Sequence, residues 1–409
     1  MTSPNACTKP ATAPWPTAPV RKSVSVDMRQ VCNSQPHSVP FLVVQSISFL
    51  VYADHNIFAV GGLGPSSRLW GAALDHIEEV EVVLADSTIK RCSATQNPDI
   101  FWAVKGAGAS FGVVTEFKLR TEPEPGEAVH FSYSFTVGSY SSLAAVFKSW
   151  QSFVADPELT RKFASEVIIT EAGMIISGTY FGSQAEYDAF DMKSKLGGDS
   201  VAKTTVFKDW LGLLGHWAEE VALRLGGGVP APLYAKTLTF NGADLIPDKV
   251  IDKVFAYLDN VDKGTLVWFV IFDLAGGAVN DVAQDATSYA HRDALFYLQS
   301  YAVGLRNVSK RTKNFLAGIN TTITDGMLGG EDFGAYAGYV DPELVNGPEE
   351  YWRTNLPRLE QIKAVVDPGD VFHNPQSVSP ANSPRKLSKP GVGNREKIRS
   401  LLARICKLH

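Results

Sequence analysis

Residues 99–119 of this chain, DIFWAVKGAGASFGVVTEFKL, join an apolar cluster to an alternating segment through three glycines. The apolar part, 100–104, predicts a buried helix, and 113–119 alternate as a half-buried strand does. Because glycine lacks a Cβ, the turn between them lets main-chain N–H groups approach a ligand closely. The residues leave two interpretations open: a turn that binds a ligand, and a turn that only packs helix against strand.

These glycines do not form the dinucleotide-binding fingerprint G-x-G-x-x-G. The third glycine, Gly112, comes one residue late, and a predicted strand follows it. In the fingerprint a helix follows, and its N-terminus faces the pyrophosphate. A Rossmann-type nucleotide site is therefore excluded at this turn.

The composition is that of a globular protein of 409 residues, 45% hydrophobic and 20% charged, which is long enough for two cores. A formal net charge of −5 gives no reason to expect nucleic acid as a partner. Cys7, Cys32, Cys92 and Cys406 are scattered without a C-x-x-C pair, so we expect no metal site and no dense disulfide framework.

Both ends of the chain differ from the rest. Residues 1–57 are rich in proline near their start, and no charged segment precedes a short apolar core as in a signal peptide. The apolar run 39–53 is short for a membrane helix and contains polar residues, so we expect a buried strand pair and no stable membrane insertion. Residues 380–409 carry eight Lys and Arg against one Glu and predict a basic tail, either disordered or ending in a short amphipathic helix.

Between the ends, the pattern predicts an α+β fold in two parts. A hairpin over 77–92 joins the helix and strand of the glycine turn, and the EPEPG run at 122–126 marks a domain boundary. Strands and amphipathic helices then alternate as in a sheet with helices on one face.

The most apolar strand ends in Asp273, and a carboxylate at the end of a buried strand is costly unless it is paired or used. A later helix has an apolar face and is stopped by Asp367-Pro368-Gly369; that face is formed by Leu356, Leu359, Ile362, Val365 and Val366.

Four stretches together resemble the berberine-bridge-enzyme-like branch of the vanillyl-alcohol oxidase superfamily, and within it the fungal glucooligosaccharide oxidases. They are residues 61–119, VWFVIFDLAGG, YAHRDALFYLQSY, and GYVDPEL with YWRTNLPRLEQIKAVVDPGDVFHNPQSV. Their order and spacing match across 58–378. The resemblance implies a secreted flavoprotein with FAD as cofactor, built from a partial PCMH-type FAD-binding domain and a substrate domain whose antiparallel sheet is covered by helices.

The resemblance also implies a division of the chain into five parts. These are an atypical N-terminus (1–57), the second half of the FAD-binding domain (58–125), a substrate-binding domain (126–335), a berberine-bridge-like segment that returns to the FAD domain (336–379) and the basic tail (380–409). The family's first FAD subdomain carries a flavin-bonded histidine in a G-G-H-S-like turn, and no Gly-Gly-His occurs here. Our hypothesis is that 1–57 is non-native and stands in place of that subdomain through a truncated or mispredicted gene.

Site residues are implied by matching the family motifs position by position. Contacts to FAD match Gly61, Gly62, Gly64, Gly112, Val113, Asn374 and Gln376. The general base matches Tyr339 in GYVDP, and its acidic helper matches Asp273. Gln299 matches a substrate-facing position, and Trp268 or Phe269 are candidates for stacking on a sugar ring. From the residues alone, Tyr339 also suits a core tyrosine, Asp273 a strand cap and Trp268 a core position.

The implied reaction is hydride transfer from the C1 hydroxyl of an oligosaccharide, or from another small alcohol, to flavin N5. Oxygen then reoxidises the flavin and leaves as hydrogen peroxide. Two alternatives stay open: a flavin-free or inactive remnant of the family, and an oxidase of a secondary metabolite. Asn307-Val308-Ser309 and Asn320-Thr321-Thr322 are N-glycosylation triplets compatible with secretion.

Overall fold

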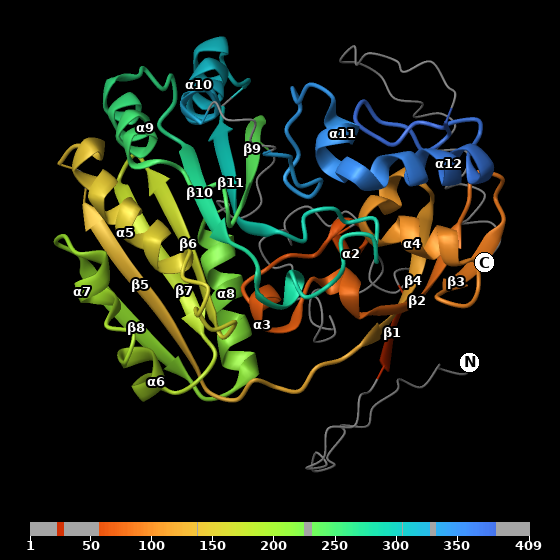
Figure 1. Ribbon diagram of the computed structural model, residues 1–409, viewed down its shortest axis with the longest axis horizontal. Helices are drawn as coiled ribbons and strands as arrows, with labels where there is room; N and C mark the ends of the chain where they lie inside the picture. Colours follow the sequence, from red (N-terminus) through yellow and green to blue (C-terminus); the bar gives the residue numbers. More distant parts are fainter. Residues whose placement is uncertain are drawn as a thin grey trace, which may run out of the picture.

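The computed structural model describes residues 23–27, 57–136, 138–224, 231–304, 306–327 and 333–381. The interpretations of the apolar run 39–53, of the basic tail from residue 382 onward and of Cys7, Cys32 and Cys406 lie outside these ranges. Two antiparallel sheets stand next to each other, each with its own helices (Figure 1). Within the described residues, no helix combines the length and apolar character needed to cross a membrane.

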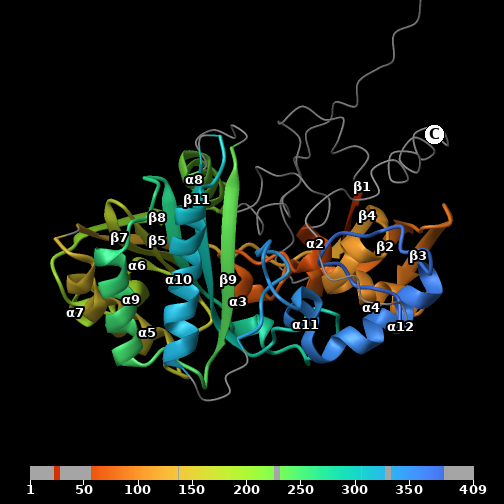
Figure 2. The same cartoon turned by 90° about the horizontal axis from the view of Figure 1, so that it is seen from above.

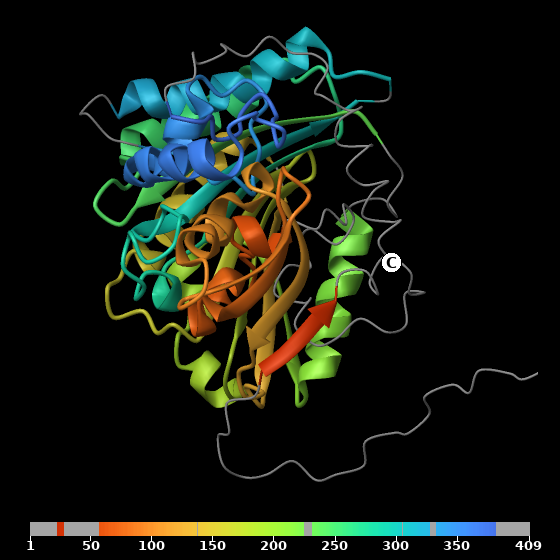
Figure 3. The ribbon, with the colours of Figure 1, turned by 90° about the vertical axis from the view of Figure 1, so that its right-hand side faces the viewer.

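The smaller sheet has the strand order β1-β4-β2-β3. Its strands are β1 (Ser23–Asp27), β2 (Ile77–Val83), β3 (Ile89–Ser93) and β4 (Val113–Arg120). The predicted hairpin and the strand after the glycine turn are thereby confirmed. At the edge of this sheet β1 pairs with β4 (Figure 3), although it lies in the region that the sequence marked as non-native and no strand was predicted there.

The glycine turn packs against its surroundings. Helix α4 (Pro98–Ala107) precedes it, with a break at Lys105 and Gly106, whose φ is +139°. A Cβ on Gly106 would overlap the backbone of Ser288 and Tyr289, and a Cβ on Gly112 would overlap the end of β2. These glycines are therefore required for close packing, the second of the two interpretations.

The larger sheet has the order β8-β5-β7-β6-β10-β11-β9 and is antiparallel throughout. Its strands are β5 (Ala128–Thr136), β6 (Phe163–Thr170), β7 (Gly173–Tyr180), β8 (Val201–Phe207), β9 (Leu233–Asn241), β10 (Trp268–Leu274) and β11 (Ala294–Val303). The segment 121–127 joins the two sheets, where the EPEPG run predicted a boundary.

Helices cover both faces of the larger sheet. On one face, three helices cover the sheet (Figure 2), and their Phe147, Phe255 and Phe315 belong to the main core. Those helices are α5 (Ala144–Val154), α9 (Asp248–Asn260) and α10 (Lys310–Gly326), with the short α6 (Gln184–Asp188) and α7 (Met192–Leu196) nearby. On the other face lies α8 (Trp210–Arg224), whose Trp217 donates to Thr179 of β7. The expectation of helices on a single face is therefore wrong.

The C-terminal segment returns to the smaller sheet, where α11 (Gly347–Trp352) and α12 (Leu356–Val366) lie over α4 (Figure 1). Leu356, Leu359 and Ile362 are buried there together with Trp102. Val365, predicted on the same face, is 80% exposed, so the apolar stripe is narrower than the sequence suggested.

The fully buried ammonium group of Lys363 holds the C-terminal segment in place against the glycine turn. Its Nζ donates to the Ser110 carbonyl oxygen at 2.6 Å, to Asp367 Oδ2 at 2.6 Å and to the Phe372 carbonyl oxygen at 2.9 Å. Both charged side chains of the pair are 0% exposed. The pair thus ties α12 to the end of the glycine turn.

Replacing this lysine is expected to destabilise the fold. Lys363→Met leaves the Asp367 carboxylate buried without its cation, and this should lower the free energy of unfolding by about 3–5 kcal/mol. The matched control is Arg358→Met, because Arg358 pairs with Asp99 on the surface, where both side chains are about half or more exposed, and should cost less than about 1 kcal/mol. Urea unfolding of both variants measures the difference, and equal losses would contradict a structural role for Lys363.

Candidate functional site

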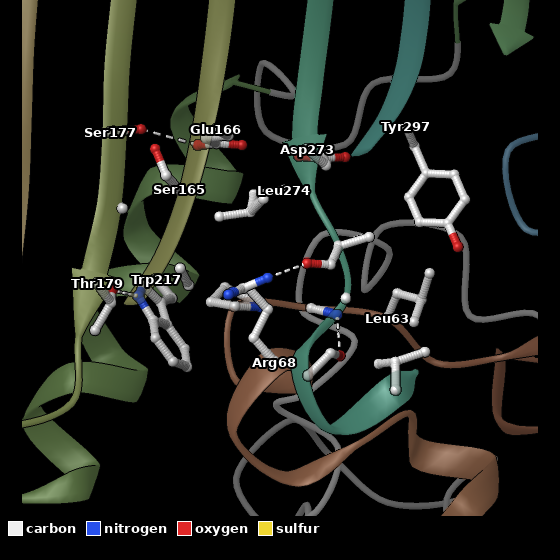
Figure 4. Close-up of a pocket in the computed structure, with 18 of the residues that line it drawn as sticks. Leu63, Arg68, Ser165, Glu166, Ser177, Thr179, Trp217, Asp273, Leu274 and Tyr297 are labelled. Atoms are coloured by element: carbon white, nitrogen blue, oxygen red, sulfur yellow. Dashed lines mark hydrogen bonds between the residues drawn. The ribbon is translucent and has the colours of Figure 1, made fainter. Parts of the chain in front are cut away.

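A pocket lies where the larger sheet meets the turn before α3 (Ser67–Trp70) (Figure 4). The space open to the centre of a water molecule is about 110 Å³. Its lining includes Leu63, Gly64, Arg68, His130, Glu166, Thr179, Trp217, Asp273, Leu274, Tyr297 and Tyr339. The pocket therefore combines several polar groups with aromatic and aliphatic walls, as binding sites generally do.

Strand alternation places Asp273 in this pocket. Its neighbours on β10, Phe272 and Leu274, pack into the main core, so Asp273 points to the opposite face of the sheet. On β11, Tyr297 pairs directly with Asp273, and Gln299 follows two residues later on the same face. Cross-strand register thus gathers polar side chains from two neighbouring strands.

A hydrogen-bond network joins three of the predicted site residues. Tyr339 donates through Oη to Asp273 Oδ2 at 3.2 Å, and Gln299 donates through Nε2 to the same oxygen. Tyr301 donates to Gln299 Oε1 at 2.6 Å and so fixes the amide orientation. The structure therefore brings Tyr339, Asp273 and Gln299 together, while their roles in a reaction stay predictions.

Tyr339 remains a neutral phenol in this setting. Burial, followed by the neighbouring Asp273 carboxylate and nearby tyrosines, holds the pKa of Tyr339 well above its usual range. The phenol therefore keeps its proton at neutral pH and directs it to Asp273. Asp273 accepts the hydrogen bond from Tyr339, and its negative charge opposes formation of the phenolate.

Tyr336, which sequence reasoning did not select, lies in a cradle formed by the first glycine turn. Burial raises the pKa of Tyr336, and the backbone of Gly62 and Leu63 at its hydroxyl opposes that rise; Gly62 has a φ of +71°. A Cβ on Gly61 or on Gly338 would overlap the Tyr336 ring. This cradle, with two convergent N–H groups and no Cβ in the way, has the donor set to hold a planar ring that bears an oxygen.

The other predicted cofactor contacts are distributed unevenly. Gly64 lines the pocket, whereas the N–H of Gly112 donates to the Gly108 carbonyl oxygen at 3.3 Å, and the cofactor contact at Gly112 stays a prediction. Val113 pairs with β2 within the smaller sheet. Asn374 is exposed, and its Oδ1 accepts from the N–H of Gln376.

Gln376 supports the loop that carries Tyr339. Its Nε2 donates to the Asp341 carbonyl oxygen at 2.6 Å, and its Oε1 accepts from Tyr351 at 3.1 Å. It does not line the pocket. Gln376 thus holds the backbone two residues beyond Tyr339 from the outside.

Trp268 is a core residue, and its prediction as a substrate contact is wrong. It is 1% exposed, packs edge-on to Phe315 and donates through Nε1 to Glu171 Oε2 at 2.8 Å. The alternation of β10 turns it to the face covered by α5, α9 and α10, away from Asp273. Phe269, its neighbour, is half-buried and lies on the face that carries Gln299.

Sequence reasoning missed several residues of the pocket wall. Arg68 belongs to the turn that it did examine, and Thr179 and Trp217 lie on the side of the pocket away from Tyr297 (Figure 4). His130 also lines the pocket. The signal for His130 was present, because polar residues occupy alternate positions of β5. Trp217 gave no such signal, since it arrives on α8 from outside the sheet.

The two glycosylation triplets behave differently. Asn307 is exposed, whereas Asn320 is a buried residue of α10 that donates to the Thr237 carbonyl oxygen at 3.1 Å. A glycan on Asn320 does not fit this fold.

Among the described residues there is also no group of three or more His, Cys, Asp or Glu side chains arranged to hold a metal ion.

Known proteins resemble the chain in both sequence and structure. Residues 335–379 match the family described as berberine and berberine like. The FAD-linked oxidoreductase sorD of Penicillium rubens is 40% identical, over 78% of this chain and 68% of that protein. The carbohydrate oxidase of Microdochium nivale is 31% identical, over 79% and 67%. A solved structure of a xylooligosaccharide oxidase from Myceliophthora thermophila in complex with xylobiose has a TM-score of 0.70 at 28% identity, covering 80% of this chain and 71% of that one. The chain thus spans about two thirds of the length of these relatives.

The positions of Trp268 and Phe269 give a stability prediction. Trp268→Ala should lower the free energy of unfolding by about 3–5 kcal/mol, because it empties a core position. Phe269→Ala should cost about 1 kcal/mol, since that ring is only partly removed from water. Urea unfolding of the two variants compares them, and equal costs would be inconsistent with the alternation of β10 described above.

Proposed function

The chain belongs to the berberine-bridge-enzyme-like family of FAD-linked oxidoreductases, and from that premise we propose that it binds FAD and oxidises the hydroxyl of a small alcohol or sugar. The observation that carries the proposal is the contact between Tyr339 and Asp273 at 3.2 Å on the wall of the pocket. A phenol that donates to a carboxylate beside a cleft is a suitable proton acceptor for a substrate hydroxyl. Gln299 and Tyr301 hold that carboxylate in place.

The cradle at Gly61, Gly62 and Leu63 is filled by Tyr336 in this structure, so it would hold the flavin ring only after the Tyr336 ring moves out. Its two N–H groups suit a carbonyl oxygen of such a ring, and Gly61 leaves room for close approach. When bound, FAD supplies the hydride acceptor and delivers the electrons to oxygen, which leaves as hydrogen peroxide.

The proton follows a route that this chain provides. The substrate hydroxyl gives its proton to Tyr339 Oη while the proton of Tyr339 moves to Asp273 Oδ2. A single transfer to a phenolate is disfavoured, because the pKa of Tyr339 lies well above its usual range. Gln299 already donates to Asp273 and keeps that oxygen oriented toward Tyr339.

Two substrate classes have support. Relatives named for oligosaccharides and carbohydrates support a sugar. A secondary metabolite stays the alternative, because a relative at 40% identity is named only as an FAD-linked oxidoreductase and Trp268, in the core, offers no platform for a sugar ring. Peroxide release from cello- and maltooligosaccharides, compared with release from aromatic alcohols, separates the two classes. We further propose that the chain is exported, with Asn307 as the available glycan acceptor.

The cofactor proposal is tested by the colour of the purified full chain. We expect the blue absorption band of oxidised flavin after expression and reconstitution with FAD. The alternative of a flavin-free remnant predicts a colourless, folded protein under the same conditions. Circular dichroism shows whether a colourless sample is folded.

Replacing the proposed base should slow the reaction specifically. Tyr339→Phe removes the group that takes the substrate proton, so the anaerobic rate of flavin reduction should fall about 10²- to 10⁴-fold. The control is Tyr140→Phe, because Tyr140 is also buried and hydrogen-bonded, to the Thr170 carbonyl oxygen, but lies in the main core on the face covered by α5, α9 and α10. A Tyr339→Phe variant as fast as the control would remove Tyr339 from the reaction.

The pH dependence distinguishes the two-proton route from a phenolate base. Because the pKa of Tyr339 is raised, a phenolate base would make the reduction rate rise about tenfold per pH unit from pH 7 to about pH 10. The route through Asp273 predicts a nearly flat rate in that range, and a rising one only in Asp273→Asn, where the carboxylate acceptor is lost. Stopped-flow reduction across pH measures both, and a tenfold rise per unit in the unmodified chain would refute the route through Asp273.

A further inference from the structure

Arg68 is a buried cation without a carboxylate partner. The described residues contain three buried Lys or Arg side chains, Arg68, Arg292 and Lys363. Arg292 pairs with Asp75 at 2.7 Å and Lys363 pairs with Asp367 at 2.6 Å. Arg68 is 6% exposed and forms no ion pair with any described acidic residue. An uncompensated buried charge is unusual, because removing it from water costs several kcal/mol.

The hydrogen bonds of Arg68 use one side of its guanidinium group. Nε donates to the Phe163 carbonyl oxygen at 2.7 Å, and Nη1 donates to the Ala275 carbonyl oxygen. Nη2 has no hydrogen bond among the described residues, and it is not one of the fully enclosed atoms that lack a partner. Because Arg68 lines the pocket, Nη2 is the nitrogen left for a ligand (Figure 4).

The carboxylates in the pocket wall are already engaged. Glu166 accepts from Ser177 at 3.0 Å, and Asp273 accepts from Gln299 and Tyr339. Arg68 is the single Lys or Arg of the lining. Burial, with a smaller contribution from Arg161, lowers the pKa of Arg68 to about 10, so the group is still charged at neutral pH. A neutral sugar in the pocket would bring no negative charge to pair with the Arg68 guanidinium.

We propose that Arg68 binds an anionic oxygen of the substrate, so that the substrate is an alcohol that also carries a carboxylate or a similarly acidic oxygen. Two N–H groups held by backbone carbonyls pre-orient the guanidinium, and this lowers the entropy cost of binding. Trp217, Leu63 and Leu274 supply an apolar wall for the body of such a molecule. That the occupant is the substrate rests on the proposed oxidase function; the recognition of the anion does not.

The test uses two ligands of nearly the same shape, 4-(hydroxymethyl)benzoate and 4-(hydroxymethyl)benzamide. Calorimetric titration of the full chain should give about tenfold to hundredfold tighter binding of the benzoate, the range expected for a hydrogen bond to a charged group. Arg68→Gln should abolish that preference, and Arg68→Lys should keep part of it. Arg161→Gln is the matched control, since Arg161 is half-exposed and pairs with Asp281 outside the lining.

The ligand pair separates recognition from a structural role. If Arg68 only holds Phe163 and Ala275 in place, Arg68→Gln weakens both ligands equally, and the proposal is wrong. Equal binding of both ligands by the unmodified chain, binding of neither, or a preference that survives in Arg68→Gln would also overturn it. A failure of the oxidase function would look different. The chain would still bind the benzoate more tightly than the benzamide, but it would show no flavin band and no turnover.

Discussion

The site depends on the cost of placing the half-buried Asp273 carboxylate on a sheet face at the wall of the pocket. The charge is tolerable only with donors, and Asp273 Oδ2 receives two of them, from Gln299 and Tyr339. Those donors come from a neighbouring strand and from a loop 66 residues further along the chain. The two hydrogen bonds to Asp273 therefore fix the distance between the strand that carries Gln299 and the loop that carries Tyr339.

The supports of Tyr339 follow from the same requirement. A hydrogen bond of 3.2 Å requires a loop that does not drift, and the chain secures it from both sides. Gln376 and Tyr351 hold the loop from the C-terminal segment, and Tyr336 fills the glycine cradle on the other side. The buried Lys363 ties the same C-terminal segment to the glycine turn. Local stability of the return segment is thus coupled to the geometry at Asp273.

The sequence predicted those features that local patterns determine. Alternation identified the hairpin and β4, and an apolar run identified β10 with Asp273 near its end. Features that depend on distant residues were missed. Gly112 was selected for a ligand but packs against β2, and Trp268 was selected from the right strand but from the wrong face. The burial of Arg68 was beyond local reasoning, because its partners are the carbonyl groups of Phe163 and Ala275.

The charged groups of the pocket differ in how fully the protein's own hydrogen bonds use them, and this difference carries information about the ligand. Glu166 accepts from Ser177, and Asp273 Oδ2 accepts from both Gln299 and Tyr339. Arg68 donates to two backbone carbonyl oxygens, and its Nη2 has no hydrogen bond among the described residues. A fold that pairs its other buried cations, Arg292 and Lys363, has no general difficulty in supplying a carboxylate. The simplest physical reason for leaving Arg68 without one is that the anion arrives with the ligand.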